Sequence, residues 1–379
     1  MTFTKTALLG CTAALLLGTA SSARELTYAI GHPPGSYLVQ GGEAFAAALA
    51  SESGGSVTAK VFPMSLLNMA ETSAGLAEGL ADMGAVMSTY FTAEYPSTNL
   101  ILDASMLLNT MGEGARGVEG PAYAGAMAEF VLTKCPECNT EFAAQNQVYT
   151  GAAGTPGYAL NCTKPVVTMD DLKGARLRIG GANWARWSQA MGATPVTMSG
   201  NEMLEALAQG VLDCIILSVP DVQNFGMGAS VKHITLGAPG GVYVASMSNM
   251  NKDSWTELSP ADRTAVLKAV AKASATATWA YQTGEAAGLD KVKTAGVQVH
   301  QADPGVMQAS AAFVETDLAA MVDTAKAKGV PRAAEMIADF KPLLEKWVDL
   351  TKGIDSADKL ADVYWTELYS KVDVTKHGL

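Results

Sequence analysis

The sequence predicts an α/β protein with two lobes, in which each lobe is a mostly parallel sheet flanked by helices and one long helix braces both lobes. Three observations lead to this fold class. Strands and helices alternate from residue 26 to residue 86, the alternation starts again near residue 147, and residues 261–295 form a proline-free run of good helix formers. The chain of 379 residues is also long for a single hydrophobic core, which favours two lobes.

Residues 1–23 have the pattern of a secretory signal peptide. Lys5 provides a positive charge, Ala7–Gly18 is apolar but too short to span a bilayer, and Ser21-Ser22-Ala23 offers small residues for cleavage after Ala23. A lipoprotein signal is the alternative, because Leu8-Leu9-Gly10-Cys11 resembles a lipobox, but the apolar run continues beyond Cys11. We therefore expect export, removal of residues 1–23 and a mature protein that works in the periplasm. No later apolar run reaches the length of a transmembrane helix.

The charge of the chain limits its partners. It has 26 Lys and Arg residues against 37 Asp and Glu residues, which gives a formal net charge of −11. Removal of the signal peptide takes away Lys5 and no acid, so the charge becomes −12. This acidity argues against nucleic acid and anionic membrane surfaces as partners. A site for an anion must then be a local basic spot.

Four cysteines remain in the mature chain: Cys135, Cys138, Cys162 and Cys214. In an oxidising compartment they permit one or two disulfides. The Cys135-Pro-Glu-Cys138 spacing also occurs in zinc and redox sites, but the four histidines are scattered, and this CxxC follows an expected helix at 122–133 and does not open one. We expect a structural disulfide in which Cys162 takes one member of the CxxC pair, and we expect Cys214 to be a small buried residue of a strand.

The first lobe is expected to comprise residues 24–150 together with 240–275. Leu26–Ile30 is rich in β-forming residues and ends in the loop Gly31-His32-Pro33-Pro34-Gly35, because two prolines cannot continue a ladder. The pattern then predicts a helix at Gly42–Ser53, a strand at Val57–Phe62, a helix at Glu71–Leu80 and a buried strand at Met83–Val86. This alternation predicts βαβ units and therefore a parallel sheet.

The second lobe is expected to comprise residues 151–239 together with 290–335. A Gly- and Pro-rich crossover at 151–157 leads into it. Its predicted strands are Tyr158–Cys162, Ala175–Ile179, Pro195–Met198 and Val211–Leu217, and its predicted helices are Trp184–Met191 and Glu202–Gln209.

The remaining helices are expected to connect the lobes. A helix over 260–295 would span about 50 Å at ~1.5 Å per residue, which is more than the width of one lobe. Residues 336–379 are predicted to form C-terminal helices that pack across the lobes, because Phe340, Leu344 and Trp347 recur at helical spacing.

The sequence lacks the common catalytic motifs. It has no GxGxxG after a strand, no Walker lysine loop, no HExxH and no GxSxG elbow. The carboxylate pair Asp170-Asp171 lies at a predicted helix start, where acidic residues match the helix dipole. We therefore expect a binding protein that is not an enzyme and that needs no cofactor and no metal ion.

Several short segments, in the same order, resemble the solute receptors of tripartite ATP-independent periplasmic (TRAP) transporters of the dicarboxylate-receptor (DctP) type. These segments are Val61–Leu67 (VFPMSLL), Leu76–Met83 (LAEGLADM), Asp171–Ile179 (DLKGARLRI), Met191–Val196 (MGATPV) with Glu202–Asp213 (EMLEALAQGVLD), and Asn251–Trp255 (NKDSW). The resemblance covers residues 26–300. It implies a two-lobed periplasmic binding protein fold that closes by a hinge over a small solute, with TRAP membrane subunits as partners.

The resemblance also implies that Arg178 is the arginine that binds a substrate carboxylate. The chemistry supports this role, because a guanidinium offers two parallel donors that fit a carboxylate, and because ligands of open α/β sheets bind at the carboxyl ends of strands. Arg176, one strand period away, is the alternative anchor. The other candidate ligand contacts are Trp184, Asn183, Ser218, His32, Ser36, Tyr37, Ser88 and Tyr90.

This sequence departs from the family pattern at three positions. Ala159 stands where several relatives carry a second arginine, Cys214 replaces the glycine of an Asp-Gly strand end, and Ser218 stands where relatives often have Asn or Pro. A single strong cation predicts one carboxylate on the ligand, so we expect a small organic anion, a monocarboxylate. A cation held beside that carboxylate is an alternative, with Asp221 and Glu202 as its ligands. Two further alternatives are a binding protein of an ABC importer or sensor system and a periplasmic enzyme.

Overall fold

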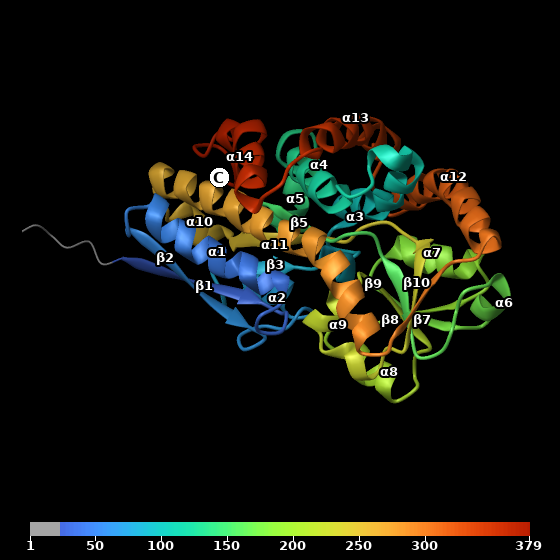
Figure 1. The fold of residues 1–379 in the computed structure, drawn as a ribbon. Helices are drawn as coiled ribbons and strands as arrows, with labels where there is room; N and C mark the ends of the chain where they lie inside the picture. The colour runs from blue at the N-terminus through green and yellow to red at the C-terminus, as the bar shows by residue number, and fades with distance from the viewer. Residues whose placement is uncertain (1–22) are drawn as a thin grey trace, which may run out of the picture.

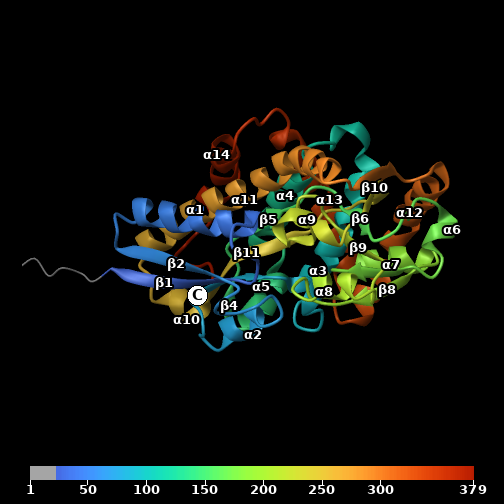
Figure 2. The same cartoon turned by 60° about the horizontal axis from the view of Figure 1, so that its bottom comes forward.

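The computed structural model describes residues 23–379, and the predicted signal peptide up to residue 22 lies outside this range. Two sheets form two lobes that lie side by side, and helices cover both (Figures 1 and 2). The buried apolar side chains form two hydrophobic cores, one in each lobe. The two-lobed α/β fold that the sequence predicts is therefore confirmed.

The first sheet has the strand order β2-β1-β3-β11-β4, and β5 also pairs with β11. Its strands are β1 (Arg24–Ile30), β2 (Val57–Pro63), β3 (Met83–Val86), β4 (Gln147–Val148), β5 (Ala152–Gly154) and β11 (Val244–Asn251). β1 is parallel to β2 and β3, as the alternation with helices predicts. β11 is antiparallel to β3, β4 and β5, so this half of the sheet is not parallel as we expected. The reason is that β11 enters from the second lobe and not through a βαβ crossover.

The second sheet has the strand order β12-β10-β6-β9-β7-β8. Its strands are β6 (Ala159–Cys162), β7 (Arg176–Ile179), β8 (Thr194–Thr197), β9 (Cys214–Leu217), β10 (His233–Pro239) and β12 (Gln298–Gln301). β7 is parallel to β8 and β9, whereas β6, which arrives from the first lobe, is antiparallel to β9 and β10. The chain thus crosses between the lobes through β5–β6 and returns through β10–β11.

Fourteen helices surround the two sheets in the described part of the chain. They are α1 (Tyr37–Glu52), α2 (Thr72–Ala77), α3 (Pro96–Asp103), α4 (Glu119–Thr133), α5 (Pro136–Ala144), α6 (Met169–Leu172), α7 (Ala182–Ala190), α8 (Met203–Ala208), α9 (Asp221–Asn224), α10 (Lys252–Thr256), α11 (Pro260–Thr294), α12 (Pro304–Ala327), α13 (Ala333–Thr351) and α14 (Ala357–Glu367). The buried side chains of α13 and α14 belong to the first core, whereas α12 contributes to both cores.

The long helix α11 connects the lobes, as predicted. It begins after Ser259, whose hydroxyl accepts a hydrogen bond from the backbone N–H of Asp262 at 3.1 Å. Its first half packs on α1 in the first lobe, and its last turns reach α9 in the second lobe (Figure 1). A methyl group at Gly284 would lie 2.6 Å from the ring of Tyr37, so this close approach of α1 and α11 requires glycine. One rigid element therefore crosses both lobes.

Helix α1 begins earlier than the sequence pattern suggests. It starts at Tyr37, with Ser36 as its N-cap, and not at Gly42. Gly41 lies inside the helix, where a Cβ atom would be 2.4 Å from the Met247 side chain and 2.8 Å from Ala277. Close packing against β11 and α11 therefore outweighs the low helix propensity of glycine. As a result, Ser36 and Tyr37 belong to a helix start and not to a loop over the ligand.

Both pairs of cysteines form disulfides, and the predicted pairing was wrong. Cys162 bonds to Cys214, which lies directly opposite it on the antiparallel neighbours β6 and β9, and Cys135 bonds to Cys138. The CxxC segment also opens α5, with Cys135 as the N-cap, although we expected no helix there. Both of its cysteines are buried, whereas reactive cysteines need access to their partners. The two disulfides are thus structural.

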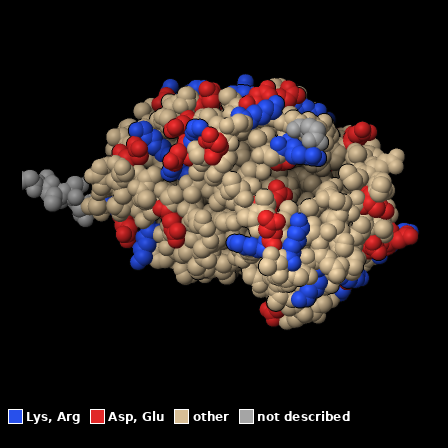
Figure 3. Space-filling view, in the orientation of Figure 1, with Lys and Arg blue, Asp and Glu red and all other residues tan. Residues whose placement is uncertain are grey.

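The surface agrees with the acidic composition. On the face shown in Figure 3, Lys and Arg side chains are interspersed with Asp and Glu and form no continuous basic patch. Within residues 23–379, no helix is both long enough and apolar enough to cross a membrane.

We predict that the two disulfides contribute unequally to stability. The Cys162–Cys214 bond joins residues separated by 52 positions and the Cys135–Cys138 bond by 3. Loop-closure entropy then predicts that the double substitution Cys162→Ala/Cys214→Ala lowers the free energy of unfolding by about 4 kcal/mol, and Cys135→Ala/Cys138→Ala by about 2 kcal/mol. Chemical denaturation of the two variants and the parent protein measures both values, and an equal or reversed order would contradict the prediction.

Candidate functional site

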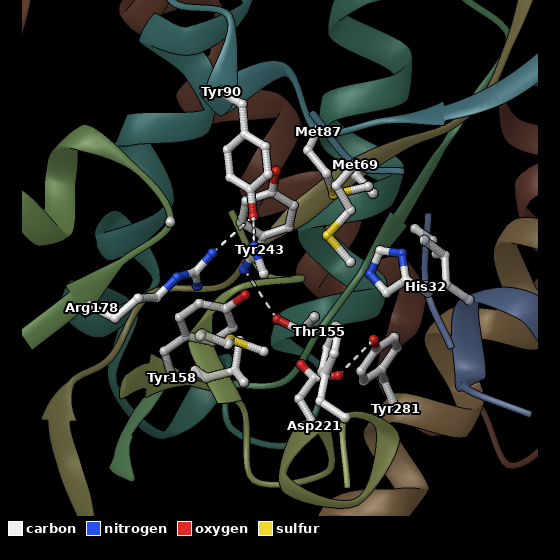
Figure 4. A pocket seen from close by; sticks show the side chains of 18 residues that line it. His32, Met69, Met87, Tyr90, Thr155, Tyr158, Arg178, Asp221, Tyr243 and Tyr281 are labelled. Carbon is white, nitrogen blue, oxygen red and sulfur yellow. Dashed lines mark hydrogen bonds between the residues drawn. The ribbon is translucent and has the colours of Figure 1, made fainter. Parts of the chain in front are cut away.

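A cavity lies where the two lobes meet, and both lobes supply its walls (Figure 4). Three lining residues lie at or just beyond the carboxyl ends of parallel strands, where open α/β sheets bind ligands: His32 after β1, Tyr90 after β3 and Arg178 on β7. The wall also contains Thr155, Tyr158, Asp221, Phe225, Tyr243 and Tyr281, with the methionines Met69, Met87 and Met203. The cavity is narrow in this arrangement of the lobes, with about 40 Å³ open to the centres of water molecules.

Arg178 is the charged donor of this cavity. Its side chain is buried, its Nε donates to the carbonyl of Met198 at 3.2 Å, and its Nη2 donates to the hydroxyl of Tyr90 at 2.8 Å. A guanidinium has five N–H groups, so three remain, two on Nη1 and one on Nη2. Among the residues that the structure describes, no Asp or Glu forms an ion pair with Arg178. The guanidinium is thus buried and positioned, yet it still has parallel donors to offer.

Arg176 has a different environment, although it is on the same strand. It is exposed, and its Nε and Nη2 donate to the two carboxylate oxygens of Asp213 at 3.0 and 3.2 Å. This ion pair holds the pKa of Asp213 down, to about 2. Because Arg176 is exposed, forms this ion pair with Asp213 and lies outside the cavity wall, Arg178 is the better candidate anchor.

Tyr90 joins the two lobes beside Arg178. Its hydroxyl oxygen accepts from Arg178 and also from the backbone N–H of Gly200 at 3.0 Å. Both hydrogen bonds use the oxygen as acceptor, so the O–H proton of Tyr90 remains to be donated. A ligand oxygen placed between Tyr90 and Arg178 would therefore meet donors from both lobes.

Asn201 makes two direct hydrogen bonds to backbone groups of the first lobe. Its Oδ1 accepts from the backbone N–H of Met69 at 3.1 Å, and its Nδ2 donates to the carbonyl of Gly31 at 2.9 Å. Met69 belongs to the first core, whereas the residues around Asn201 belong to the second lobe. The side chain therefore stabilises the arrangement in which the cavity is closed.

Three aromatic rings lie nearly parallel along one side of the cavity. The ring centroids of Tyr158 and Trp184 are 4.5 Å apart, and that of Tyr243 is 6.4 Å from each of them. Trp184 is buried behind Tyr158, and its indole N–H donates to the carbonyl of Gly240 at 3.0 Å. Tyr158 and Tyr243 form the wall, and Trp184, which we expected at the ligand, supports Tyr158 from behind.

Asp221 places a carboxylate in the same cavity. It is buried, and it accepts hydrogen bonds from the Ser218 hydroxyl at 2.6 Å, the Asn224 amide at 2.9 Å and the Tyr281 hydroxyl at 2.9 Å. Burial raises the pKa of Asp221, while these hydrogen bonds and the charge of Arg178 act in the opposite direction. The cavity thus contains one guanidinium and one carboxylate.

In Figure 4, His32 lies on the side of the cavity opposite Arg178. Its ring packs against Phe225, with 5.5 Å between the centroids, and its Nδ1 is buried without a hydrogen-bond partner in the described structure. Burial lowers the pKa of His32 to about 3, so the ring is neutral at physiological pH. The site therefore has one unused polar atom on the first lobe.

The structure brings three of the predicted site residues into the cavity wall: Arg178, His32 and Tyr90. Ser218 lies behind the wall and holds Asp221. The remaining candidates lie outside the wall. Ser36 precedes α1, and its buried hydroxyl has no hydrogen-bond partner in the described structure. Tyr37 packs on Tyr281, Ser88 lies near Ser246, Asn183 donates to Ser105, and Trp184 stacks on Tyr158. Glu202, one of the two candidate cation ligands, accepts from the backbone N–H of Ser199 and is not part of the wall. No group of three or more potential metal ligands occurs within the described residues.

Sequence reasoning missed the aromatic wall. Tyr158 and Tyr243 lie where the chain crosses between the lobes, Tyr281 is in the middle of α11, and Phe225 follows the short helix α9. None of these positions belongs to a motif with a known chemistry. One signal for Tyr158 and Tyr243 was available in the sequence. Each follows a Gly-rich segment, and such crossover segments approach the cleft between two lobes.

Comparison with known proteins identifies the family. Residues 28–324 match the family model DctP, which is described as bacterial extracellular solute-binding protein, family 7. A solute-binding protein of Chromohalobacter salexigens is 26% identical over 144 residues, which is 38% of this chain and 42% of that protein. The match to this relative therefore spans less than half of its length.

Solved structures show the same fold. An extracytoplasmic solute receptor of Bordetella pertussis that binds pyroglutamic acid has a TM-score of 0.63 and 21% identity, over 90% of this chain and 99% of that one. A TRAP periplasmic solute-binding protein of Bordetella bronchiseptica with bound mandelate has a TM-score of 0.68 and 22% identity, over 85% and 99%. A marine metagenome TRAP solute-binding protein specific for aromatic acid ligands has a TM-score of 0.70 and 17% identity, over 86% and 99%.

The matched family is one of solute-binding proteins, and solved structures with the same fold include TRAP receptors. The chain belongs to the DctP family, the family 7 bacterial extracellular solute-binding proteins.

Proposed function

We propose that this receptor captures a small organic acid in the interlobe cavity and that Arg178 binds its carboxylate. The observation that carries the proposal is a buried guanidinium in the cavity wall without an ion-pair partner in the described structure. A buried charge costs several kcal/mol unless it is paired. A ligand carboxylate would offset this cost through two parallel charge-assisted hydrogen bonds.

The lining supports a ligand with one carboxylate. Arg178 is the one Lys or Arg among the described residues of the cavity wall, and Ala159 gives no second cation on β6. The wall around the guanidinium consists mainly of aromatic, methionine and small side chains. We therefore propose a monocarboxylate whose remaining part is compact and partly apolar.

Closure of the lobes would couple binding to transport. A ligand that contacts Arg178 on one lobe and Tyr90 on the other binds the closed form better than the open form, and so it shifts the population toward closure. We propose that the protein is exported, that the signal peptide is cleaved after Ala23, and that the TRAP membrane subunits recognise the closed, loaded receptor in the periplasm.

A thermal-shift screen of the mature protein tests this function. Pyroglutamate, mandelate, 3-hydroxyphenylacetate and small aliphatic acids form the panel, with matched amides as uncharged controls. A bound acid raises the melting temperature by mass action. We expect at least one acid to stabilise the protein while its amide does not. Stabilisation by amides and acids alike would contradict a carboxylate site.

We predict that Arg178→Met weakens the binding of the best acid by about 100-fold, because two charge-assisted hydrogen bonds are lost. Arg178→Lys keeps the charge but not the parallel donors and should lose about 10-fold. The melting temperature of ligand-free Arg178→Met should change little, since the loss of the hydrogen bonds to Met198 and Tyr90 is offset by the removal of a buried charge that has no ion-pair partner in the described structure. Isothermal titration calorimetry measures the affinities.

Arg176→Met is the matched control, because Arg176 is on the same strand but is exposed and paired with Asp213. Its affinity for the acid should equal that of the parent protein. An unchanged affinity in Arg178→Met, or an equal loss in both variants, would remove Arg178 from the proposed role.

We also predict that Asn201→Ala lowers ligand affinity by about 5- to 10-fold although Asn201 does not line the cavity. The variant loses two hydrogen bonds between the lobes, each with a net contribution of about 0.5–1.5 kcal/mol. Gln209→Ala is the control, since Gln209 is exposed and its amide bonds only to Glu205 of its own helix. Calorimetry gives the affinities, and small-angle X-ray scattering should show a larger radius of gyration for ligand-free Asn201→Ala. Equal affinities in all three proteins would contradict a role for Asn201 in closure.

A further inference from the structure

We propose that the natural ligand is a zwitterion, an α-amino acid or a related compound, whose carboxylate binds Arg178 and whose cationic nitrogen binds Asp221. This inference deepens the proposed function and rests on it, because it takes the position of the carboxylate from Arg178. It follows from the distribution of charge over the whole cavity.

The charges of the cavity wall form a pair of opposite sign. Within the described lining, Arg178 is the one cationic side chain and Asp221 is the one acidic side chain. His32 is neutral, because burial lowers its pKa to about 3. Burial raises the pKa of the phenols of Tyr158, Tyr243 and Tyr281, so these side chains are neutral near pH 7. The empty cavity is therefore neutral overall but polarised.

A ligand with a carboxylate alone would leave this cavity with an uncompensated negative charge. Its carboxylate would pair with Arg178, and Asp221 would then remain as a buried anion without a cation, a costly situation in a low-dielectric site. A zwitterion supplies one charge to each partner, so the loaded cavity is neutral and each charge is paired. The observed pair of wall charges thus favours a zwitterion over a simple acid.

Asp221 has the capacity to accept one more donor. A carboxylate has about four acceptor positions, and the described structure fills three of them, from Ser218, Asn224 and Tyr281. These three donors fix the orientation of the carboxylate at the cavity wall. Burial raises the pKa of Asp221, so a cation bound next to it would relieve an existing cost.

The surroundings of Asp221 also suit a cationic nitrogen. The aromatic rings of Tyr158, Phe225 and Tyr281 line the same cavity, and ring faces attract alkylammonium groups. His32 lies on this side, with its buried Nδ1 unpartnered, and in the neutral ring a nitrogen without hydrogen accepts a hydrogen bond. In Figure 4, Arg178 enters from the side opposite His32, so donors and acceptors face each other across the cavity.

Matched ligand series test the inference in the parent protein. Each series keeps the carbon skeleton and changes the nitrogen: L-leucine, 2-hydroxy-4-methylpentanoate and 4-methylpentanoate; L-phenylalanine, 3-phenyllactate and 3-phenylpropionate; L-proline and tetrahydrofuran-2-carboxylate. We expect at least one amino acid to bind about 10- to 100-fold more tightly than its nitrogen-free partners, as measured by calorimetry.

Asp221→Asn should abolish this preference, because it removes the charge that pairs with the ammonium group. In this variant the amino acid should bind no more tightly than its nitrogen-free partners. The control is Asp82→Asn, since Asp82 also accepts three hydrogen bonds, from the backbone and hydroxyl of Thr27 and from Ser254, but lies outside the cavity. The control should keep the preference of the parent protein.

The outcomes separate this inference from the proposed function. If the nitrogen-free acids bind as tightly as the amino acids, or if no amino acid binds below about 1 mM while an acid does, the zwitterion is excluded and the organic-acid receptor stands. If no compound of either kind binds, both proposals fail for these ligands. The comparison in the parent protein decides between these cases even if Asp221→Asn does not fold.

Discussion

Two hydrogen bonds hold Arg178 at the junction of the lobes. Its guanidinium donates to the carbonyl of Met198 on its own lobe and to the phenol oxygen of Tyr90 on the other lobe. These two hydrogen bonds leave three donors of a buried guanidinium unused within the described structure. Much of the cavity is arranged around this charge. Tyr90 is fixed by Gly200 as well as by Arg178, and Asn201, the next residue, bonds two backbone groups of the first lobe. The guanidinium of Arg178, which has no ion-pair partner in the described structure, is therefore bonded to Tyr90, one of the residues that join the two lobes.

The rigid elements make this coupling possible. Helix α11 crosses both lobes and contributes Tyr281 to the cavity, and its first half packs tightly on α1. The crossover segments before β6 and β11 carry Tyr158 and Tyr243 into the same wall. Movement of one lobe against the other would change the distance between Arg178 on β7 and Tyr90 of the first lobe, which a hydrogen bond now joins. Residues of the site thus lie on the segments that connect the lobes.

Short sequence patterns predicted the strands and helices that depend on interactions between nearby residues. The alternation of Val57–Phe62 and the buried run Met83–Val86 both mark strands of the structure, and the proline-free stretch is one helix of 35 residues. Arg178 was identified through the resemblance of residues 171–179 to a family segment, and its place near the carboxyl end of a predicted strand supported the role. Tertiary contacts determined the rest. Close packing against β11 and α11 makes α1 begin at Tyr37. The register of β6 and β9 places Cys162 opposite Cys214. β11 comes from the second lobe and pairs antiparallel with β3 in the first sheet. The aromatic wall and Asp221 come together only through long-range contacts, and so no short segment could reveal the cavity as a whole.

A crystal structure of the mature protein with its tightest-binding acid tests the central claim most directly. The account predicts the ligand carboxylate within hydrogen-bonding distance of both Nη1 and Nη2 of Arg178, with the lobes closed and Tyr90 in contact with the same carboxylate. A ligand bound elsewhere, or one whose carboxylate faces away from the guanidinium, would contradict it.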